Sequence, residues 1–375
     1  MLPPDGGEAM AGGIELDKVT RIVDGETHLA DISLTLDPGS FNVLLGRTRA
    51  GKTSLLRVLA GLDRPGSGAL REDGADITRA DIRRRSVAMV YQQFVNYPSL
   101  RVYDNIASPL RIQKLDAREI DRRVRETAAR LRLDALLDRL PAELSGGQQQ
   151  RTAIARALVK GARLVLLDEP LANLDYKLRE ELRAEIRGLF RGGEAIVVYA
   201  TSEPAEALLL GGQVAVLDEG RLLQRGPALD VYRAPATERV GVVFSDPPMN
   251  LLDAEILPGG EARLAGAVLR LSGHLGALPP GPCRVGVRPN HVRLAPASPA
   301  DHRIPATVDI EEIGGSETLL HATAGGVPLS ALLDGVHRHP LGASIDLFLD
   351  PGRLFAFALD GHGRLLAAPE SNGSH

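Results

Sequence analysis

The sequence of 375 residues has no tryptophan, one cysteine and only 3% aromatic residues. So few aromatic side chains leave little material for base-stacking platforms or for the aromatic belts that flank membrane spans. The lone Cys283 excludes an internal disulfide and fits a reducing compartment, and we expect it to be a small buried apolar residue. No apolar run approaches the roughly 20 residues that cross a bilayer, and the first residues lack a signal-peptide pattern. We therefore expect a cytoplasmic chain.

The chain also lacks a strong charge of either sign, because 44 basic and 48 acidic residues give a net charge of −4. Proteins that bind nucleic acid need a basic surface to neutralise phosphates, so no nucleic-acid partner is expected. The short basic run Arg83, Arg84 and Arg85 is expected to be a solvated face. What the chain does have is length and 44% apolar residues, enough for two hydrophobic cores.

The first part of the chain alternates short apolar runs with helical patterns, which predicts βαβ units and a largely parallel sheet. A helical pattern at about 113–140 predicts an inserted helical subdomain, placed at about 93–150. The clearest predicted strands are FNVLLG (41–46), RLVLLDE (163–169), AIVVYAT (195–201) and QVAVLDEG (213–220).

The sequence pattern changes after about residue 236, where short β-like runs such as CRVGVRP and LFAFALD are separated by Gly and Pro. This pattern predicts a second, all-β and barrel-like domain. We therefore expect an α/β domain over 14–236 and a β-rich domain over 240–368. The ends, 1–13 and about 368–375, are expected to be disordered because they are rich in small and polar residues.

A glycine-rich segment, GRTRAGKT, lies where a predicted strand turns into the apolar-periodic helix SLLRVLAGL. Its glycines let backbone N–H groups approach phosphate oxygens, and the helix N-terminus adds partial positive charge. Lys52 would reach the β and γ phosphates, and Thr53 would offer its hydroxyl to Mg²⁺. A chance glycine-rich turn is the alternative, against which the flanking strand and helix argue. The segment predicts a nucleotide-binding loop of Gly46, Arg47, Thr48, Arg49, Ala50, Gly51, Lys52 and Thr53. Kinases, GTPases and motors share such a loop, so the reaction stays open at this point.

Two acids end the predicted strand RLVLLDEP (163–170). Asp168 would bind Mg²⁺ through water, and Glu169 would polarise the attacking water, because phosphoryl transfer depends on positioning and charge. An ordinary strand end is the alternative interpretation.

A third motif, LSGGQQQR (144–151), precedes the helical pattern RTAIARALV. Ser145 is placed as a helix N-cap, and Gly146 and Gly147 leave backbone N–H groups open to an anion. A plain helix cap explains Ser145 alone, but not why such a loop precedes an acidic strand end in a chain with a phosphate loop.

Together these motifs resemble the ABC ATPase family, whose LSGGQ signature is matched from Leu144 to Gln148. VYQQFVNYPSL (90–100) is similar to the family's Q-loop, which implies that Gln92 senses Mg²⁺ and the γ-phosphate while the next segment touches a permease. LANLD (171–175) is similar to the D-loop, with Asp175 implied to cross to the partner subunit. The resemblance implies two subunits paired head to tail, with each ATP enclosed by the phosphate loop of one and the signature of the other.

The second domain narrows the resemblance, because FSDPPMNLL (244–252) and VGVRPNHVRL (285–294) are similar to segments of carbohydrate- and polyol-importer ATPases with an OB/TOBE-like regulatory extension. This implies an ATPase at the cytoplasmic face of the inner membrane that powers uptake through transmembrane permease subunits. The Q-loop and TSEPAEALLLGG also resemble glycerol-type importer ATPases, which work as unlike pairs. His291, His337 and His339 are expected to be isolated surface histidines rather than metal ligands.

Three positions depart from the family pattern. The switch histidine that contacts the γ-phosphate aligns with Ser202, whose shorter hydroxyl would need a bridging water. The aromatic residue that stacks on adenine aligns with Val23, and a usual loop glycine aligns with Arg49. Either these are tolerated changes in a homodimer, or the chain pairs with a different ATPase subunit whose active site its LSGGQ completes.

Two other functions compete with transport. ABC proteins of nucleic-acid repair or translation usually carry two cassettes or long coiled-coil insertions, and this chain shows one cassette and no basic surplus. A largely non-hydrolytic nucleotide-binding scaffold is favoured by Ser202 and Val23 but opposed by the retained Lys52, Asp168 and Glu169. The sequence therefore predicts an ATP-hydrolysing importer subunit.

Overall fold

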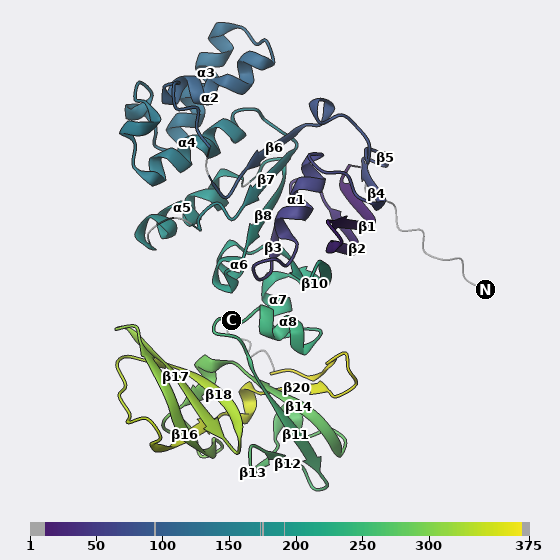
Figure 1. The fold of residues 1–375 in the computed structure, drawn as a ribbon, viewed down its shortest axis with the longest axis vertical. Coiled ribbons are helices and arrows are strands. Elements are labelled where there is room, and N and C mark those ends of the chain that lie inside the picture. Colours follow the sequence, from purple (N-terminus) through teal and green to yellow (C-terminus); the bar gives the residue numbers. More distant parts are fainter. Residues whose placement is uncertain (1–11, 94, 173, 175, 191, 370–375) are drawn as a thin grey trace, which may run out of the picture. The chain divides into compact units, whose positions relative to one another are not determined.

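The computed structural model describes residues 12–93, 95–172, 174, 176–190 and 192–369 (Figure 1). The chain divides into two compact units, residues 1–222 and 223–375. The helices that begin in the first unit are α1 (Lys52–Ala60), α2 (Val102–Ile112), α3 (Ala117–Arg130), α4 (Gly146–Leu158), α5 (Tyr176–Leu189) and α6 (Pro204–Leu210). Its strands are β1 (Ile14–Val23), β2 (Glu26–Leu36), β3 (Phe41–Leu45), β4 (Ser67–Glu72), β5 (Ala75–Asp76), β6 (Val87–Val90), β7 (Leu164–Asp168), β8 (Ile196–Thr201), β9 (Gln213–Asp218) and β10 (Arg221–Pro227).

A six-stranded sheet in the order β10-β9-β3-β8-β7-β6 forms the centre of the first unit. β3 pairs in parallel with β8 and β9, and β7 pairs in parallel with β6 and β8. Every residue of β7 and β8 is buried, as expected for parallel strands covered on both faces. The predicted α/β fold is confirmed. Because parallel strands end at a common edge, the segments that follow β3, β7 and β8 come together there.

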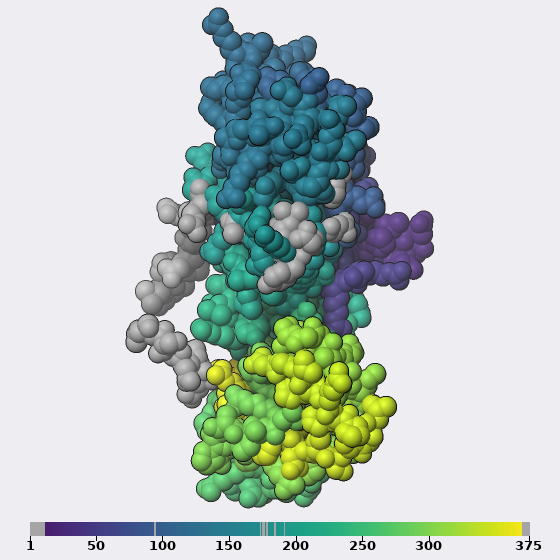
Figure 2. Space-filling view, turned by 90° about the vertical axis from the view of Figure 1, so that its left-hand side faces the viewer, coloured from purple at the N-terminus to yellow at the C-terminus, as the bar shows by residue number. Residues whose placement is uncertain are grey.

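A second, antiparallel sheet in the order β2-β1-β4-β5 packs with α1 and the central sheet in one apolar core. Leu55, Leu56 and Leu59 of α1 are at most 1% exposed and share this core with Leu16 of β1 and Leu44 of β3. Figure 2 shows the N-terminal strands, coloured purple, standing out from the side of the first unit. The core thus fixes α1 between the two sheets.

Three helices, α2, α3 and α4, are inserted between β6 and β7, in the region where the sequence predicts helices (Figure 1). The N-terminus of α3 is capped by Asp116, whose carboxylate accepts hydrogen bonds from the backbone N–H groups of Arg118 and Glu119. α4 begins after Ser145, which forms a capping box with Gln148. Capping side chains therefore set where α3 and α4 start.

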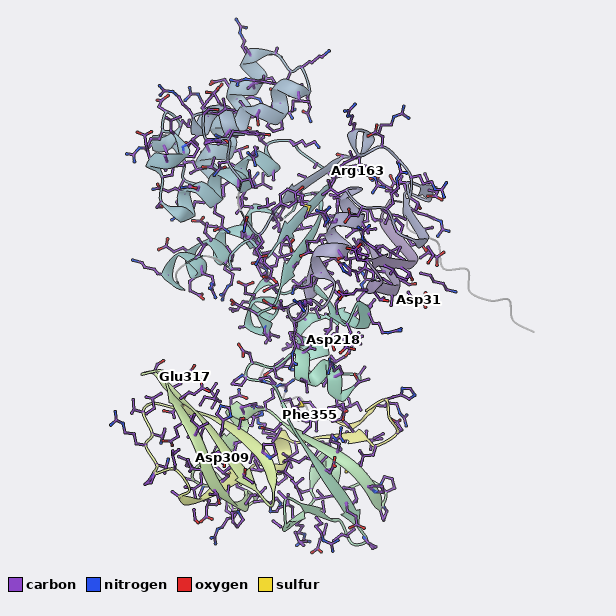
Figure 3. The ribbon with its side chains drawn as sticks, viewed as in Figure 1. Asp31, Arg163, Asp218, Asp309, Glu317 and Phe355 are labelled. Atoms are coloured by element: carbon purple, nitrogen blue, oxygen red, sulfur yellow. The ribbon has the colours of Figure 1, made fainter. Side chains whose placement is uncertain are left out.

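The second unit begins with α7 (Ala228–Arg233) and α8 (Glu238–Val243) and continues as two antiparallel sheets, so the predicted all-β domain is confirmed. One sheet has the order β13-β12-β11-β14-β20-β21 and the other the order β15-β19-β16-β17-β18. Phe355, labelled in Figure 3, stacks on Phe357 with ring centroids 6.2 Å apart. The strands are β11 (Asn250–Leu257), β12 (Glu261–Leu264), β13 (Ala267–Arg270), β14 (Gly281–Val287), β15 (Val292–Arg293), β16 (His302–Ile313), β17 (Glu317–Ala324), β18 (Val327–Asp334), β19 (Ser344–Leu349), β20 (Phe355–Ala358) and β21 (Leu365–Ala367).

The division between the units falls within β10, earlier than the seam expected between 236 and 240. The segment before α8 already bonds within the second unit, because the guanidinium of Arg288 donates to the carbonyl oxygen of Tyr232 at 2.6 Å. The N–H of Glu238 donates to the carbonyl oxygen of Gly363 at 2.8 Å, and the N–H of Leu365 donates to the carbonyl oxygen of Ala236 at 2.9 Å. The expected disorder of the ends concerns mainly residues 1–11 and 370–375, which lie outside the described residues.

Burial tests three expectations about single side chains. Cys283 is 2% exposed, which confirms the buried apolar role, and burial raises the pKa of its thiol. Arg85 is 8% exposed, so its prediction as a solvated residue is wrong; its guanidinium donates to the carbonyl oxygens of Leu59 and Ile77. His291 is partly buried rather than on the surface, and desolvation, with Arg288 nearby, lowers its pKa to about 4. No helix in the described ranges is long and apolar enough to cross a bilayer.

Candidate active site

A hollow of about 500 Å³ lies where the segments following β3 and β7 meet. It gathers the phosphate loop with Gln92 and Glu169, which are far apart in the sequence. Its lining residues are Glu26, Thr27, His28, Thr48, Arg49, Ala50, Gly51, Lys52, Thr53, Ser54, Gln92 and Glu169. The volume and the polar lining suit a nucleotide.

The phosphate loop is held by contacts that only glycine allows at two positions. A Cβ on Gly46 would lie 2.5 Å from the carbonyl oxygen of Leu217, and the N–H of Gly46 donates to the carbonyl of Thr201 at 3.2 Å. Gly51 has φ 101°, and a Cβ there would lie 2.6 Å from the carbonyl oxygen of His28. The loop therefore passes closely between β8, β9 and β2 before α1 begins.

Lys52 connects the loop to the end of β7. Its side chain is 5% exposed, and Nζ donates to the carbonyl oxygens of Gly46 at 2.6 Å and Arg47 at 3.1 Å. Nζ also lies 3.0 Å from Oε1 of Glu169. Nε2 of Gln92 donates to the other oxygen, Oε2, at 3.3 Å. Glu169 is thus held between a lysine and an amide, and its φ of 43° places it at a sharp turn after the strand.

Thr53 and Asp168 form an oxygen pair beside Glu169. The hydroxyl of Thr53 donates to Oδ1 of Asp168 at 3.1 Å. Asp168 is 3% exposed, and burial, with the charge of Glu169 adding to it, raises the pKa of its carboxyl. The hydrogen bond from Thr53 and the charge of Lys52 act to lower this pKa.

This oxygen pair fits Mg²⁺, which binds few protein oxygens and takes its other ligands from phosphates and water. No group of three or more His, Cys, Asp or Glu side chains that could hold a metal occurs within the described ranges. Thr53 and Asp168 could therefore hold a metal ion whose other ligands are oxygens of the substrate.

Ser202 is exposed directly after β8 and is not among the described residues that line the hollow. The residues around it are fixed by a buried carboxylate that the sequence analysis missed. Oε2 of Glu206, a residue 3% exposed, accepts hydrogen bonds from the hydroxyls of Thr201 at 2.7 Å and Tyr199 at 3.1 Å. The N–H of Glu203 donates to the Thr201 hydroxyl at 3.0 Å. A tyrosine and a threonine inside an otherwise apolar strand were the signal that could have revealed this network.

The signature loop is not part of this hollow, as far as the described lining residues show. Ser145 accepts from the N–H of Gln148 at 3.4 Å, and Oε1 of Gln148 accepts from the N–H of Ser145 at 3.0 Å. Gly146 has nothing within 4 Å of the position of a Cβ, while Gly147 is buried. Asp175 of the predicted D-loop lies outside the described residues.

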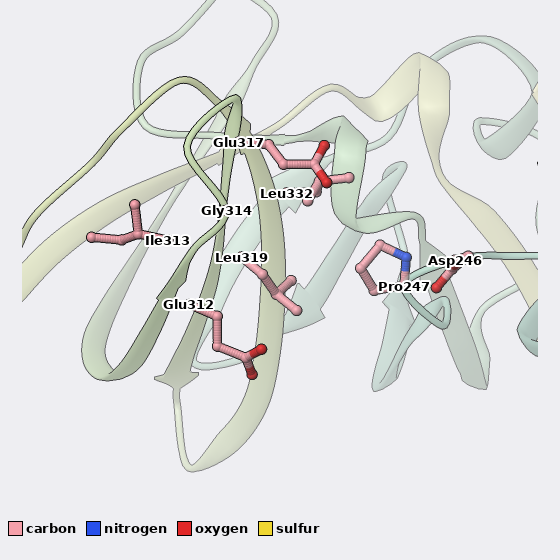
Figure 4. Close-up of a pocket in the computed structure, with 8 residues that line it drawn as sticks. All are labelled: Asp246, Pro247, Glu312, Ile313, Gly314, Glu317, Leu319 and Leu332. Atoms are coloured by element: carbon pink, nitrogen blue, oxygen red, sulfur yellow. The ribbon is translucent and has the colours of Figure 1, made fainter. Parts of the chain in front are cut away.

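Another hollow, of about 400 Å³, lies in the second unit (Figure 4). Asp246, Glu312 and Glu317 line it together with apolar residues such as Leu319 and Leu332. Its described lining residues include three acids and no basic side chain, so they offer no cation for phosphate. The chemistry predicted from the sequence therefore belongs to the first hollow.

Comparison with known proteins agrees with the fold and this geometry. Residues 29–172 match the ABC transporter family and residues 285–357 match the TOBE domain. The chain is 39% identical over 347 residues to the sn-glycerol-3-phosphate import ATP-binding protein UgpC of Salmonella typhimurium, covering 90% of this chain and 95% of the relative. It is 36% identical over 365 residues to the trehalose/maltose import ATP-binding protein MalK of Thermococcus litoralis, covering 92% and 97%.

Among solved structures, the chain resembles the ATP-binding cassette MJ0796 in a dimeric post-hydrolysis state bound to ADP and Pi. The TM-score is 0.52 at 27% identity, with 57% of this chain and 98% of that chain covered. A parallel sheet with a phosphate loop, an acidic strand end, a helical insertion and the LSGGQ signature loop, together with the family match, defines an ABC ATPase, a protein that binds ATP. The chain belongs to the ABC transporter ATP-binding proteins with a TOBE domain, whose ATPase activity energises import.

Proposed function

We propose that this chain binds and hydrolyses ATP in the first hollow and drives a carbohydrate or polyol importer. The observation that carries the proposal is the meeting of Lys52, Thr53, Asp168 and Glu169 within hydrogen-bonding distance at one sheet edge. A phosphate loop alone binds nucleotide, whereas an adjacent carboxylate beside a metal-binding oxygen pair supplies what hydrolysis needs.

Each residue has a separate task in this proposal. Lys52 neutralises the β and γ phosphates, and Thr53, Asp168 and Gln92 hold Mg²⁺, which neutralises phosphate charge when bound. Glu169 accepts a proton from the attacking water as general base. Because Lys52 pairs with Glu169 at 3.0 Å, nucleotide phosphates draw the lysine away and free the carboxylate for water.

Replacing Glu169 tests the hydrolytic assignment. In the chain assayed alone, Glu169→Gln should lower its own slow ATP turnover at least about 100-fold, the usual contribution of a general base, while ATP binding persists and the closed dimer accumulates. Steady-state phosphate release and equilibrium ATP binding are the measurements. Glu126→Gln, on an exposed face of α3 where Glu126 pairs with Arg122, is the matched control and should leave both unchanged. Turnover at the full rate in Glu169→Gln would show that another group is the base.

The solute is proposed from the relatives. Their names describe import of sn-glycerol-3-phosphate and of trehalose or maltose, which are all polyhydroxylated molecules. We infer import of a carbohydrate or polyol, with glycerol as one candidate. Vesicles containing this chain and its permease subunits, tested with labelled glycerol, glycerol-3-phosphate and maltose, should accumulate one of them in an ATP-dependent manner. Accumulation of none would refute the solute class.

The chain is further proposed to act at the cytoplasmic face of the membrane, bound to transmembrane permease subunits and without a nucleic-acid partner. We also propose that its ATPase partner is a non-identical subunit. Ser202, Val23 and Arg49, which replace residues of the family pattern, support a slow site of its own. The intact signature loop, capped by Ser145, supports a role in completing the partner's site. The alternative is a weakly hydrolytic nucleotide-binding partner subunit with a degenerate site.

A further inference from the structure

The hollow is lined at one side by the phosphate loop and at another by the start of β2. Glu26, Thr27 and His28 are consecutive residues of that strand, and all three line the hollow. In a regular strand, successive side chains point to opposite faces, so consecutive lining residues need an explanation.

A β-bulge provides it. Thr27 pairs with Ile22 and Leu29 pairs with Arg21, which leaves His28 as the extra residue between two successive pairs. A bulge changes the direction of the side chains around it, and bulges are frequent next to active sites. Here it allows Thr27 and His28 to face the hollow together.

The half-buried ring of His28 is also fixed in place. Its Nδ1 lies 3.0 Å from the hydroxyl of Ser54, which follows Thr53 in the first turn of α1. The backbone at His28 packs against Gly51 and Gly220, because a Cβ on either glycine would lie within 2.8 Å of the His28 carbonyl oxygen. The ring therefore has a set position relative to the phosphate loop.

The imidazole of His28 is the one ring among the described residues that line the hollow. Val23, at the end of β1, is not among these lining residues. Phosphates at the N-terminus of α1 leave the region beside β2 for the nucleoside, and nucleobases stack on flat side chains, histidine included.

We propose that His28 binds the base of the nucleotide by stacking, with its ring oriented by Ser54. This rests on the proposed function, in that the phosphates must occupy the loop at Lys52. His28 is then the residue that distinguishes a nucleotide from a bare polyphosphate.

Calorimetric binding of two probes, ATP and inorganic tripolyphosphate, to the full chain tests this proposal. His28→Ala should weaken ATP binding about tenfold, as expected for loss of one stacking contact, and change tripolyphosphate binding less than about twofold. His28→Phe keeps a ring and should restore most of the ATP affinity. His28→Asn keeps a hydrogen-bonding group near Nδ1 without the ring and should behave as His28→Ala. His302→Ala, at a partly exposed histidine of the second unit bonded to the Arg270 carbonyl, is the matched control.

Equal loss for both probes in His28→Ala would overturn the proposal, because His28 would then act by holding the loop. Unchanged ATP affinity would overturn it as well. Lys52→Ala separates this from failure of the proposed function. If Lys52→Ala leaves both probes bound as before, the phosphate site is misplaced; if it weakens both while His28→Ala weakens neither, only the role of His28 falls.

Discussion

At the scale of the residue, Arg49 carries an unusual backbone conformation for its type. Its φ is 68°, in the left-handed region, where a side chain costs roughly 1 kcal/mol. The residue is exposed and lines the hollow, so its positive charge can act on phosphates bound there. A strained residue at a binding loop suggests that the side chain contributes something that glycine would not.

Arg49→Gly should therefore have opposite effects on stability and on binding. Release of strain, partly offset by the freedom of glycine in the unfolded chain, should raise the unfolding temperature by up to about 2 °C. Loss of the charge should weaken ATP binding several-fold at low salt and less at high salt. Differential scanning fluorimetry and calorimetry measure the two effects. Lys114→Gly, at an exposed residue with φ 58° between α2 and α3, is the control and should change stability only. ATP affinity that is the same in both variants would contradict a phosphate contact.

At the scale of the element, the strands and the phosphate loop could be predicted because each is a local pattern. The buried run Leu164–Asp168 and the glycine spacing before Lys52 are visible without knowledge of neighbours. The burial of Arg85 could not be predicted, because its partners are carbonyl groups near the end of α1. The bulge at His28 depends on the register between two strands, which residue types do not specify.

The network between β8, α5 and α6 also could not be predicted from residue types alone. Glu206 joins Tyr199 and Thr201 and lies 4.0 Å from Arg183 of α5, and Arg179 of α5 pairs with Glu203 at 2.6 Å. These contacts fix the segment that contains Ser202 and connect it to the helix that follows the predicted D-loop. The position of Ser202 thus depends on side chains from three elements.

Glu206 makes folding stability decrease as the pH rises. Burial, as the largest cause, raises the pKa of its carboxyl above the ordinary value of 4.5, although the Thr201 bond opposes this. The folded state therefore binds the proton more readily than the unfolded state, so the stability contributed by Glu206 is full below pH 4.5 and is lost as the pH rises through the folded pKa.

The free energy of unfolding of Glu206→Gln relative to the native chain tests this. The free energy of unfolding of the variant should lie furthest below that of the native chain at about pH 4.5. The difference should shrink as the pH rises, because the native chain then loses stability while glutamine does not titrate. Denaturant titrations across this range supply the measurement. Glu126→Gln, exposed on α3, should differ from the native chain by a small, nearly constant amount. A deficit that grows toward neutral pH would contradict the assigned direction.

At the scale of the whole molecule, we propose that a second subunit completes the ATP site. The phosphate loop lines the hollow, whereas the signature residues Ser145 to Gln148 are not among its described lining residues. The similar cassette MJ0796 was solved as a dimer with ADP and Pi. If a second subunit supplies its signature to this hollow, the three departures from the family pattern weaken one site of the pair and leave the other, built on the partner's phosphate loop, complete.

The purified chain alone should therefore hydrolyse ATP slowly. Addition of a non-identical ATPase subunit encoded beside its permease should raise turnover at least about tenfold, because the intact signature of this chain then completes the active site of that subunit. In the mixed pair, Glu169→Gln in this chain should cost little, whereas substitution of Gly146 by a bulky residue should cost most of the activity. Phosphate release and the mass of the ATP-bound complex measure these outcomes. Ser202→His should raise the turnover of the chain alone if the missing imidazole limits it. Fast, Glu169-dependent hydrolysis by the chain as a homodimer would refute the unlike pair.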